Sequence, residues 1–333
     1  MVLTPPIQPM LAEAWPELPP ERALPGGLAI EQKPDGYRAL LFARPGHAFL
    51  QSRNGADLTP AFPELAAAAR ALGRPLVLDG ELVVAHAGRL HFGELQARAR
   101  RRGSGAAQAA VDRPAYLIVF DVLEAGGAEL LTRPYRERRA LLEELFADRV
   151  LATPFTPCSA TTDRAIGADW LDPAWGAAGI EGVVVKGLAQ PYRPGHRGWI
   201  KVRARETADA VVGGVTGVVH APSTLLLGRY DQADRLRLVA RTAPLSTAGR
   251  REVGALLHPA GREHPWHGVR FSAGWGRGDL DFTPVRPELV VEFLADTALD
   301  DGRWRHPVRY LHVRDDLGPD QLPRYGAGGQ PST

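Results

Sequence analysis

The sequence predicts an α+β fold of two domains. Residues 1–205 should form antiparallel sheets flanked by helices, and residues 206–325 a smaller β-barrel of the OB type, followed by a flexible tail over 326–333. Three observations lead to this prediction. The chain has 333 residues, more than one hydrophobic core usually serves. Residues 28–203 alternate short apolar runs with helix-like stretches. Beyond residue 205 the pattern changes to short strands with one helix, which is typical of a small barrel.

The elements of the first domain follow from apolar periodicity and turn signals. Prolines within residues 1–28 favour an extended segment. The pattern then predicts a strand from Leu28 to Lys33, a hairpin over 37–42 and 48–52, a helix over 63–72, and strands at 76–78 and 82–84 on either side of the acidic residues 79–81. A helix over 92–102 should end at the glycines that follow it. Next come a strand over 116–122, an amphipathic helix over 133–146 with its basic residues facing solvent, and strands over 179–186 and 199–203.

The second domain shows a different pattern of apolar runs and turn residues. Short strands are predicted over residues 210–219, 224–230, 236–242, 289–295 and 309–314, with a short helix over 246–257. Glycine, proline and histidine are dense over 258–278, which predicts a long loop. Five strands and one helix are what the OB barrel requires.

Composition excludes several classes of protein. The net charge is only +2, so a nucleic-acid surface must be a local patch rather than the whole molecule. No apolar run approaches about 18 residues, and the N-terminus lacks a basic region followed by an apolar stretch, so we expect neither a membrane span nor a secretory signal. The single Cys158 excludes an internal disulfide framework and a multi-cysteine zinc site. We therefore expect a cytoplasmic protein.

Lysine is rare, and its positions are informative. Only three of the 40 basic side chains are lysines: Lys33, Lys186 and Lys201. Arginine stays protonated at any working pH, whereas a lysine can lose its proton and become a nucleophile. Lys33 is the candidate, because it follows an apolar strand and precedes Gly36, where the backbone can approach a ligand closely.

Charged residues also cluster around later strands. Asp79 and Glu81 flank a glycine between two apolar strands and are either solvated acids of a turn or site residues. In the last strand of the domain, alternation places Lys201 and Arg203 on one face, which is unfavourable unless an anion lies over them. That pair predicts a phosphate site. Lys186, at the far end of the preceding strand, either lies in solvent or contacts ligand.

Taken together, five segments resemble the ordered motifs of ATP-dependent DNA ligases, which belong to the covalent nucleotidyltransferases. Residues 33–38 (KPDGYR) match motif I, 79–81 (DGE) motif III, 120–121 (FD) motif IIIa, 181–186 (EGVVVK) motif IV and 199–203 (WIKVR) motif V. Residues 303–316 resemble motif VI. The Arg-His-Pro-Val-Arg segment at 305–309 is similar to the short, two-domain C-type ligases of actinobacteria.

This resemblance implies a three-step reaction. Lys33 attacks the α-phosphate of ATP and forms lysyl-AMP, the AMP moves to a 5′-phosphate at a nick, and the 3′-hydroxyl then displaces AMP and seals the strand. Because a lysine amine is ordinarily protonated, burial and nearby positive charge must favour its neutral form. The resemblance makes the first domain an adenylation domain and implies nicked or gapped duplex DNA as partner, a divalent metal (Mg²⁺ or Mn²⁺), and a monomer working with repair polymerases or end-binding proteins.

The resemblance also assigns roles to single residues. Lys33 is the nucleophile, Glu181 with Asp35 holds the metal, Glu81 binds the ribose, Phe120 stacks on adenine and Glu31 selects it. Further ATP contacts are assigned to Asp35, Arg38, Arg53, Arg197, Lys201 and Arg203. Basic side chains that could bind the DNA backbone, or simply face solvent, are Arg98, Arg100, Arg101, Arg102, Arg305, Arg309 and Arg314.

Two departures from the family pattern leave questions. Motif V commonly has a second lysine where Arg203 stands, and motif VI commonly ends in a lysine where Asp316 stands. The second change reverses a charge that normally orients the outgoing pyrophosphate, so either another residue, such as Arg305, Arg309 or Arg314, takes that task, or ATP activation is slower. The alternatives are a capping-type guanylyltransferase, an RNA ligase, or a non-catalytic OB-fold module that binds nucleic acid.

Overall fold

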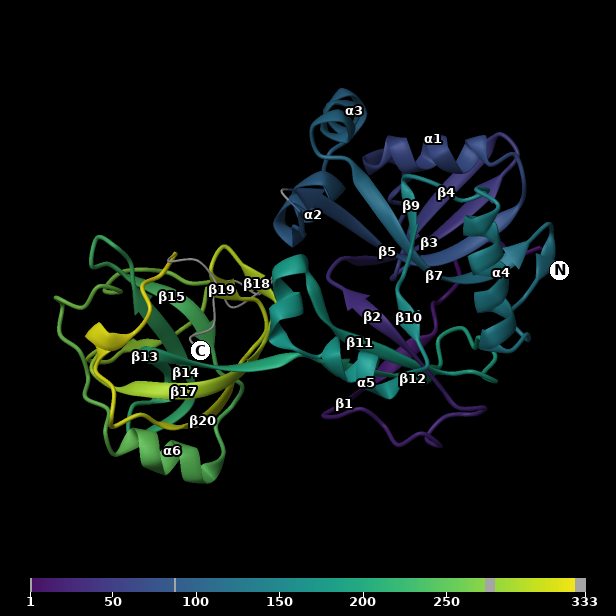
Figure 1. Cartoon of the computed structure of the whole chain (residues 1–333). Coiled ribbons are helices and arrows are strands. Elements are labelled where there is room, and N and C mark those ends of the chain that lie inside the picture. Colours follow the sequence, from purple (N-terminus) through teal and green to yellow (C-terminus); the bar gives the residue numbers. More distant parts are fainter. Residues whose placement is uncertain (1, 87, 273–278, 327–333) are drawn as a thin grey trace. The chain divides into compact units, whose positions relative to one another are not determined.

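The computed structural model describes residues 2–86, 88–272 and 279–326, and the chain divides into two compact units, 1–204 and 205–333 (Figure 1). The predicted boundary after residue 205 differs from this division by one residue. Helices in the described part of the chain are too short or too polar to serve as membrane spans.

The first unit contains two main sheets. One has the strand order β1-β12-β11-β2-β10, and all pairs are antiparallel except β1 with β12. Its strands are β1 (Leu11–Trp15), β2 (Leu28–Pro34), β10 (Ala160–Thr161), β11 (Ile180–Gly187) and β12 (Arg197–Arg203). The candidate nucleophile, Lys33, lies near the end of β2, between β11 and β10 in this sheet.

The second sheet has the order β4-β3-β5-β7-β8, with β6 paired to β5 and β9 paired in parallel to β7. Its strands are β3 (Tyr37–Arg44), β4 (His47–Ser52), β5 (Leu76–His86), β6 (Arg89–Leu90), β7 (Ala115–Ala125), β8 (Ala128–Glu129) and β9 (Phe155–Pro157). The chain passes from β2 to β3 through Asp35 and Gly36, so motif I joins the two sheets.

Helices cover one side of the second sheet. Leu65 of α1 and Leu142 and Leu145 of α4 pack with strand residues such as Leu41 and Leu78 in one buried cluster. The helices of this unit are α1 (Pro63–Ala71), α2 (Phe92–Ala99), α3 (Gly103–Asp112), α4 (Tyr135–Ala147) and α5 (Arg164–Asp169), with 3-10 turns η1 (Thr59–Ala61) and η2 (Pro173–Ala178). The opposite side of the sheet contributes Leu40, Phe42 and Phe120 to a second cluster that includes Trp199 of β12, so the two sheets share a core.

Three features of this unit differ from what the sequence pattern favoured. Of the two alternatives for residues 79–81, the turn is wrong, because β5 continues through them and both neighbours β3 and β7 pair with them. The helix predicted over 92–102 ends earlier, at Ala99, and the glycines that follow residue 102 begin another helix, α3. Helix α4 does not turn all its basic residues to solvent, since Arg138 is buried against Asp121.

The second unit is a curled sheet of the OB type. Its order is β15-β14-β13-β17-β20, with β16 (Thr283–Pro284) beside β13. A parallel bridge between Thr242 and Val308 links the ends of β15 and β20 and closes the strand order. The remaining elements are β13 (Arg205–Val218), β14 (Ala221–Tyr230), β15 (Leu236–Arg241), α6 (Thr247–Gly254), β17 (Val290–Asp296), β18 (Leu299–Asp300), β19 (Arg303–Trp304), β20 (Arg309–Val313) and η3 (Pro319–Gln321).

This arrangement confirms the predicted α+β fold. Each of the five predicted strands and the helix of the second domain is found within a few residues of its predicted span, and the Ser246 hydroxyl caps α6 by accepting from the Gly249 N–H at 3.1 Å. The predicted tail and part of the predicted loop lie outside the described residues.

Candidate functional site

The candidate site is centred on the amine of Lys33. Nζ of Lys33 makes a direct ion pair with Glu181 of β11, and the Lys33 side chain is 21% exposed while that of Glu181 is 7% exposed. The pairing of β2 with β11 is irregular between Ile180 and Val183, at Gly182. Gly182 has φ +138°, and an added Cβ would lie 2.2 Å from the Val202 carbonyl oxygen. Only glycine permits this bulge. It interrupts the regular alternation of side chains along β11 beside Glu181.

Cations surround this pair. Nε of Arg203 lies 4.0 Å from Glu181. Burial lowers the pKa of Lys201, and repulsion from Arg203, Lys33 and Arg53 lowers it further. Lys201 therefore lies within the influence of three other positive charges, an arrangement that a polyphosphate would stabilise. The predicted phosphate-binding face of β12 thus has the electrostatic character that the sequence indicated.

Carboxylates gather at the same place. Burial raises the pKa of Glu81 to about 7, repulsion from Glu181 and Asp35 contributes to the rise, and attraction to Lys33 and Arg38 opposes it. Four residues assigned by the motifs, from β2, β5, β11 and the β2–β3 turn, are therefore close enough to influence each other's charge. The structure brings together the candidate nucleophile Lys33, the proposed metal ligands and the proposed ribose ligand.

The raised pKa of Glu81 predicts a pH dependence of stability. In the unfolded chain a glutamate titrates near pH 4.3, whereas folded Glu81 keeps its proton up to about pH 7. Between these values the folded state binds the extra proton, so its contribution makes the free energy of unfolding fall as pH rises, and become constant above about pH 7. Urea unfolding of wild type and Glu81→Gln at pH 5 and pH 8 should show a larger fall for wild type. Equal falls in the two proteins would show that Glu81 does not cause this pH dependence of stability.

Arg38 is partly buried, and its guanidinium is bonded to a buried carboxylate. Its guanidinium donates to both carboxylate oxygens of Asp79, with Nη2 at 2.6 Å from Oδ2, and lies 4.6 Å from the ring centre of Phe120. The Tyr192 hydroxyl donates to the same carboxylate at 2.6 Å. This network ties β3 to β5, so the structure gives Arg38 a role in holding motif I beside motif III. The ATP contact predicted for Arg38 stays a prediction.

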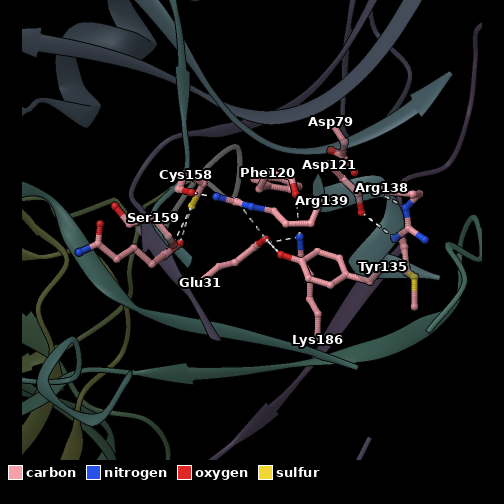
Figure 2. Close-up of polar contacts among 12 residues, drawn as sticks. Glu31, Asp79, Phe120, Asp121, Tyr135, Arg138, Arg139, Cys158, Ser159 and Lys186 are labelled. Carbon is pink, nitrogen blue, oxygen red and sulfur yellow. Dashed lines mark hydrogen bonds and ion pairs between the residues drawn. The ribbon is translucent and has the colours of Figure 1, made fainter. Parts of the chain in front are cut away.

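Lys186 does not lie in solvent, contrary to one of the two alternatives. Its side chain is 1% exposed, and Nζ lies 2.6 Å from Oε2 of Glu31 and donates to the Phe120 carbonyl at 3.2 Å (Figure 2). The ammonium also lies 4.5 Å from the ring centre of Phe120 and 4.4 Å from that of Trp199. The residues predicted to recognise adenine, Glu31 and Phe120, are thus both held by Lys186.

The predicted DNA-binding arginines divide into two groups. The prediction for Arg98 is wrong, because its side chain is 2% exposed, pairs with Glu64 at 2.7 Å and donates to the carbonyl of Arg113. Burying an arginine requires such partners, so its role is to hold α2 against α1. In contrast, Arg100, Arg101 and Arg102 are exposed at the turn between α2 and α3.

In the second unit, Arg314 forms ion pairs with two aspartates. It donates to both oxygens of Asp316, the nearer at 2.7 Å, and to Asp209 at 3.1 Å. Asp316, which stands where the family commonly has lysine, is therefore a partner of the neighbouring arginine. Arg309 is exposed and Arg305 is half-buried.

Several residues of the site region carried no signal in the sequence. Tyr135 contacts Glu31, and Arg138 and Tyr192 contact the motif residues Asp121 and Asp79, yet none of the three lies in a motif. Arg53 and Arg197, predicted to bind ATP, are exposed, and Arg197 donates to the carbonyl of Ala12 at 3.3 Å.

Comparisons with known proteins agree with the geometry. Residues 9–203 match the model of the "ATP dependent DNA ligase domain". The chain is 35% identical to DNA ligase C2 of Mycolicibacterium smegmatis, over 94% of this chain and 91% of the relative. It is also 35% identical to DNA ligase C of Mycobacterium tuberculosis, over 95% and 92%.

Solved structures show the same similarity. The ligase domain of M. tuberculosis LigD is 29% identical, with a TM-score of 0.51 over 96% of this chain and 98% of that chain. A mycobacterial DNA ligase D complexed with ATP and MES is 31% identical, with a TM-score of 0.51 and the same coverage. Since the family model spans more than half of the chain and the relatives match over more than nine-tenths of it, the chain belongs to the ATP-dependent DNA ligase family.

Proposed function

We propose that this ligase seals nicks between a 3′-hydroxyl and a 5′-phosphate in duplex DNA through an AMP carried on Lys33. The observation that carries the proposal is the Lys33 amine held against Glu181, with Lys201, Arg203 and Arg53 close enough to interact electrostatically. A nucleophilic nitrogen placed among cations meets the requirements of attack on a triphosphate, because the cations offset the charge of the phosphate oxygens.

The reaction then divides into three displacements at phosphorus. The neutral Nζ of Lys33 forms a bond to the α-phosphorus of ATP and loses a proton to solvent, while the bond to the bridging oxygen breaks and pyrophosphate leaves with the electron pair. An oxygen of the 5′-phosphate next attacks the same phosphorus, and the P–N bond breaks as the amine regains a proton. The 3′-hydroxyl finally attacks the 5′-phosphate, loses its proton, and releases AMP. Each leaving group is better than the one a single-step reaction would require.

The carboxylates of the site fit a divalent metal. Glu181, Asp35 and Glu81 act on one another's charge, and such a set of oxygen ligands suits Mg²⁺ or Mn²⁺. Glu181 and Asp35 would hold the ion, which would neutralise charge on the triphosphate. Glu81 would bind the ribose hydroxyls, and Lys201 and Arg203 the α-phosphate.

DNA is proposed to contact the exposed arginines at the α2–α3 turn. The variant Arg100→Gln/Arg101→Gln/Arg102→Gln should weaken binding to nicked duplex and reduce the slope of log K against log salt by up to about 3, because each phosphate contact contributes about 0.9 to that slope. Fluorescence anisotropy at several salt concentrations measures both. A control that removes the same charge from other exposed positions is Arg133→Gln/Arg136→Gln/Arg149→Gln. Equal losses in the two variants would show a general charge effect instead of a contact surface.

The proposed first step has a direct test. Intact mass after incubation with ATP and Mg²⁺ or Mn²⁺ should increase by one AMP, and addition of nicked DNA should remove the AMP and join the strand. A capping-type enzyme would instead gain GMP from GTP. Sealing of a nick in RNA alone would point to an RNA ligase, and no adduct with either nucleotide would leave only a binding module. Repair polymerases and end-binding proteins are the partners proposed for the enzyme.

A further inference from the structure

The carboxylate of Glu31 lies in a buried cluster built by three other side chains. Oε1 accepts a hydrogen bond from the Tyr135 hydroxyl at 2.5 Å, and Oε2 is 2.6 Å from Nζ of Lys186. Nη1 of Arg139 lies 3.8 Å from Oε1 (Figure 2). Strand alternation places Glu31 on the same face of β2 as Lys33, two residues away, so this cluster and the nucleophile share one face.

Tyr135 is well suited to fix the direction of this carboxylate. It is the first residue of α4, its side chain is almost completely buried, and its backbone N–H donates to the Gln190 carbonyl at 2.9 Å. Burial and the negative charge of Glu31 raise the pKa of Tyr135, so the hydroxyl keeps its proton and donates it. Arg139, one turn further along α4, adds positive charge on the same side and donates to the Cys158 carbonyl at 3.0 Å.

The cluster also decides which hydrogen-bonding group remains for a ligand. The donors of Lys186 are directed at Glu31, at the Phe120 carbonyl and toward the rings of Phe120 and Trp199. An ionised carboxylate is an acceptor only and has about four lone-pair positions, of which Tyr135 and Lys186 use two. What remains is an acceptor. The exocyclic group of adenine is an amino donor, whereas the corresponding group of guanine is a carbonyl oxygen.

We infer that Tyr135 is a positioning residue that makes the site select ATP over GTP, by holding the Glu31 carboxylate so that it accepts from the adenine amino group. This inference rests on the proposed function. Without the hydroxyl, the carboxylate can rotate toward Lys186 and Arg139, and the ammonium gains freedom to donate to the carbonyl oxygen of guanine. Tyr135 itself contacts neither the phosphates nor Lys33 in this account, so it should act on nucleotide affinity and not on the rate of the bond-forming step.

The test compares lysyl-AMP and lysyl-GMP formation in wild type and Tyr135→Phe over a range of ATP and GTP concentrations. For Tyr135→Phe we expect the half-saturating ATP concentration to rise about tenfold, the order expected for one hydrogen bond to a charged acceptor. The maximal rate should stay within about twofold, and the preference for ATP over GTP should fall about tenfold. Tyr116→Phe removes a hydroxyl from β7, in the same unit but outside the cluster. It should leave the half-saturating ATP concentration, the maximal rate and the preference for ATP unchanged.

The outcomes are separable. If wild type forms no adduct, the proposed function fails. If wild type forms the adduct but Tyr135→Phe keeps the same preference for ATP, or loses maximal rate with unchanged half-saturation, the inference is overturned. Should Tyr135→Phe fail to fold by circular dichroism, Arg139→Gln decides, since it weakens the hold on Glu31 from the same helix. It should lower the ATP preference about threefold, and an unchanged preference there also overturns the inference.

Discussion

Replacing Lys33 by arginine is expected to abolish the AMP adduct and reduce nick sealing at least about ten-thousand-fold. Arginine keeps the positive charge that pairs with Glu181, but its guanidinium does not lose a proton at working pH and cannot attack phosphorus. The substitution therefore removes the nucleophile while leaving the local charge balance. Intact mass after incubation with ATP and metal, and gel assays of strand joining, measure the two effects.

A pre-adenylated nick provides the control for this variant. The last step joins a 3′-hydroxyl to an already activated phosphate and forms no bond to Lys33. The Lys33→Arg protein should therefore seal such a substrate much better than it seals an ordinary nick with ATP. An adduct that still forms in this variant would move the nucleophile to Lys186 or Lys201, the other lysines of the chain.

The largest expected effect on stability comes from the buried pair of Arg138 and Asp121. Nε and Nη2 of Arg138 lie 2.8 Å and 2.9 Å from the two carboxylate oxygens, and both side chains are at most 1% exposed. Arg138→Met leaves the Asp121 charge buried without this partner, so the free energy of unfolding should fall by about 3–5 kcal/mol. Urea unfolding followed by tryptophan fluorescence measures the change.

Two further variants separate the charge from the volume of the side chain. Arg138→Met/Asp121→Asn removes both charges and keeps an acceptor for the Val122 N–H, so it should recover much of the lost stability. Arg136→Met makes the same substitution at an exposed position of α4 and should change stability by less than about 0.5 kcal/mol. If Arg138→Met were as stable as Arg136→Met, the ion pair would not be what holds α4 to β7.

The second domain shows where prediction from the sequence succeeds. The OB barrel was predictable because its strands are short, apolar and separated by turn residues, and each signal lies within a few neighbouring positions. Lys33 stands out as the candidate nucleophile because so few lysines occur, and each coincides with a motif. In the structure Lys33 indeed lies against Glu181, 148 residues away, as a shared site requires.

The failures have a common cause. Arg98 and Arg138 looked like solvent-facing charges because helical periodicity alone places them among other polar residues, but each is buried with an acid from another element, Glu64 or Asp121. Asp79 looked like part of a turn, yet β5 continues through it because Arg38 on the neighbouring strand satisfies its charge. The cost of burying a charge depends on its partner, and a local pattern does not show that partner.

The sequence by itself therefore determined the order of the elements, the candidate nucleophile and the family to which the chain belongs. The tertiary structure alone decided which charged side chains are buried, and that Glu31, Lys186 and Tyr135 form one cluster. The physical reason is the separation along the chain over which each kind of interaction acts. Periodicity and turn preference act between neighbours in the chain, whereas ion pairs and hydrogen bonds join whichever residues strand register and helix packing bring within about 3 Å.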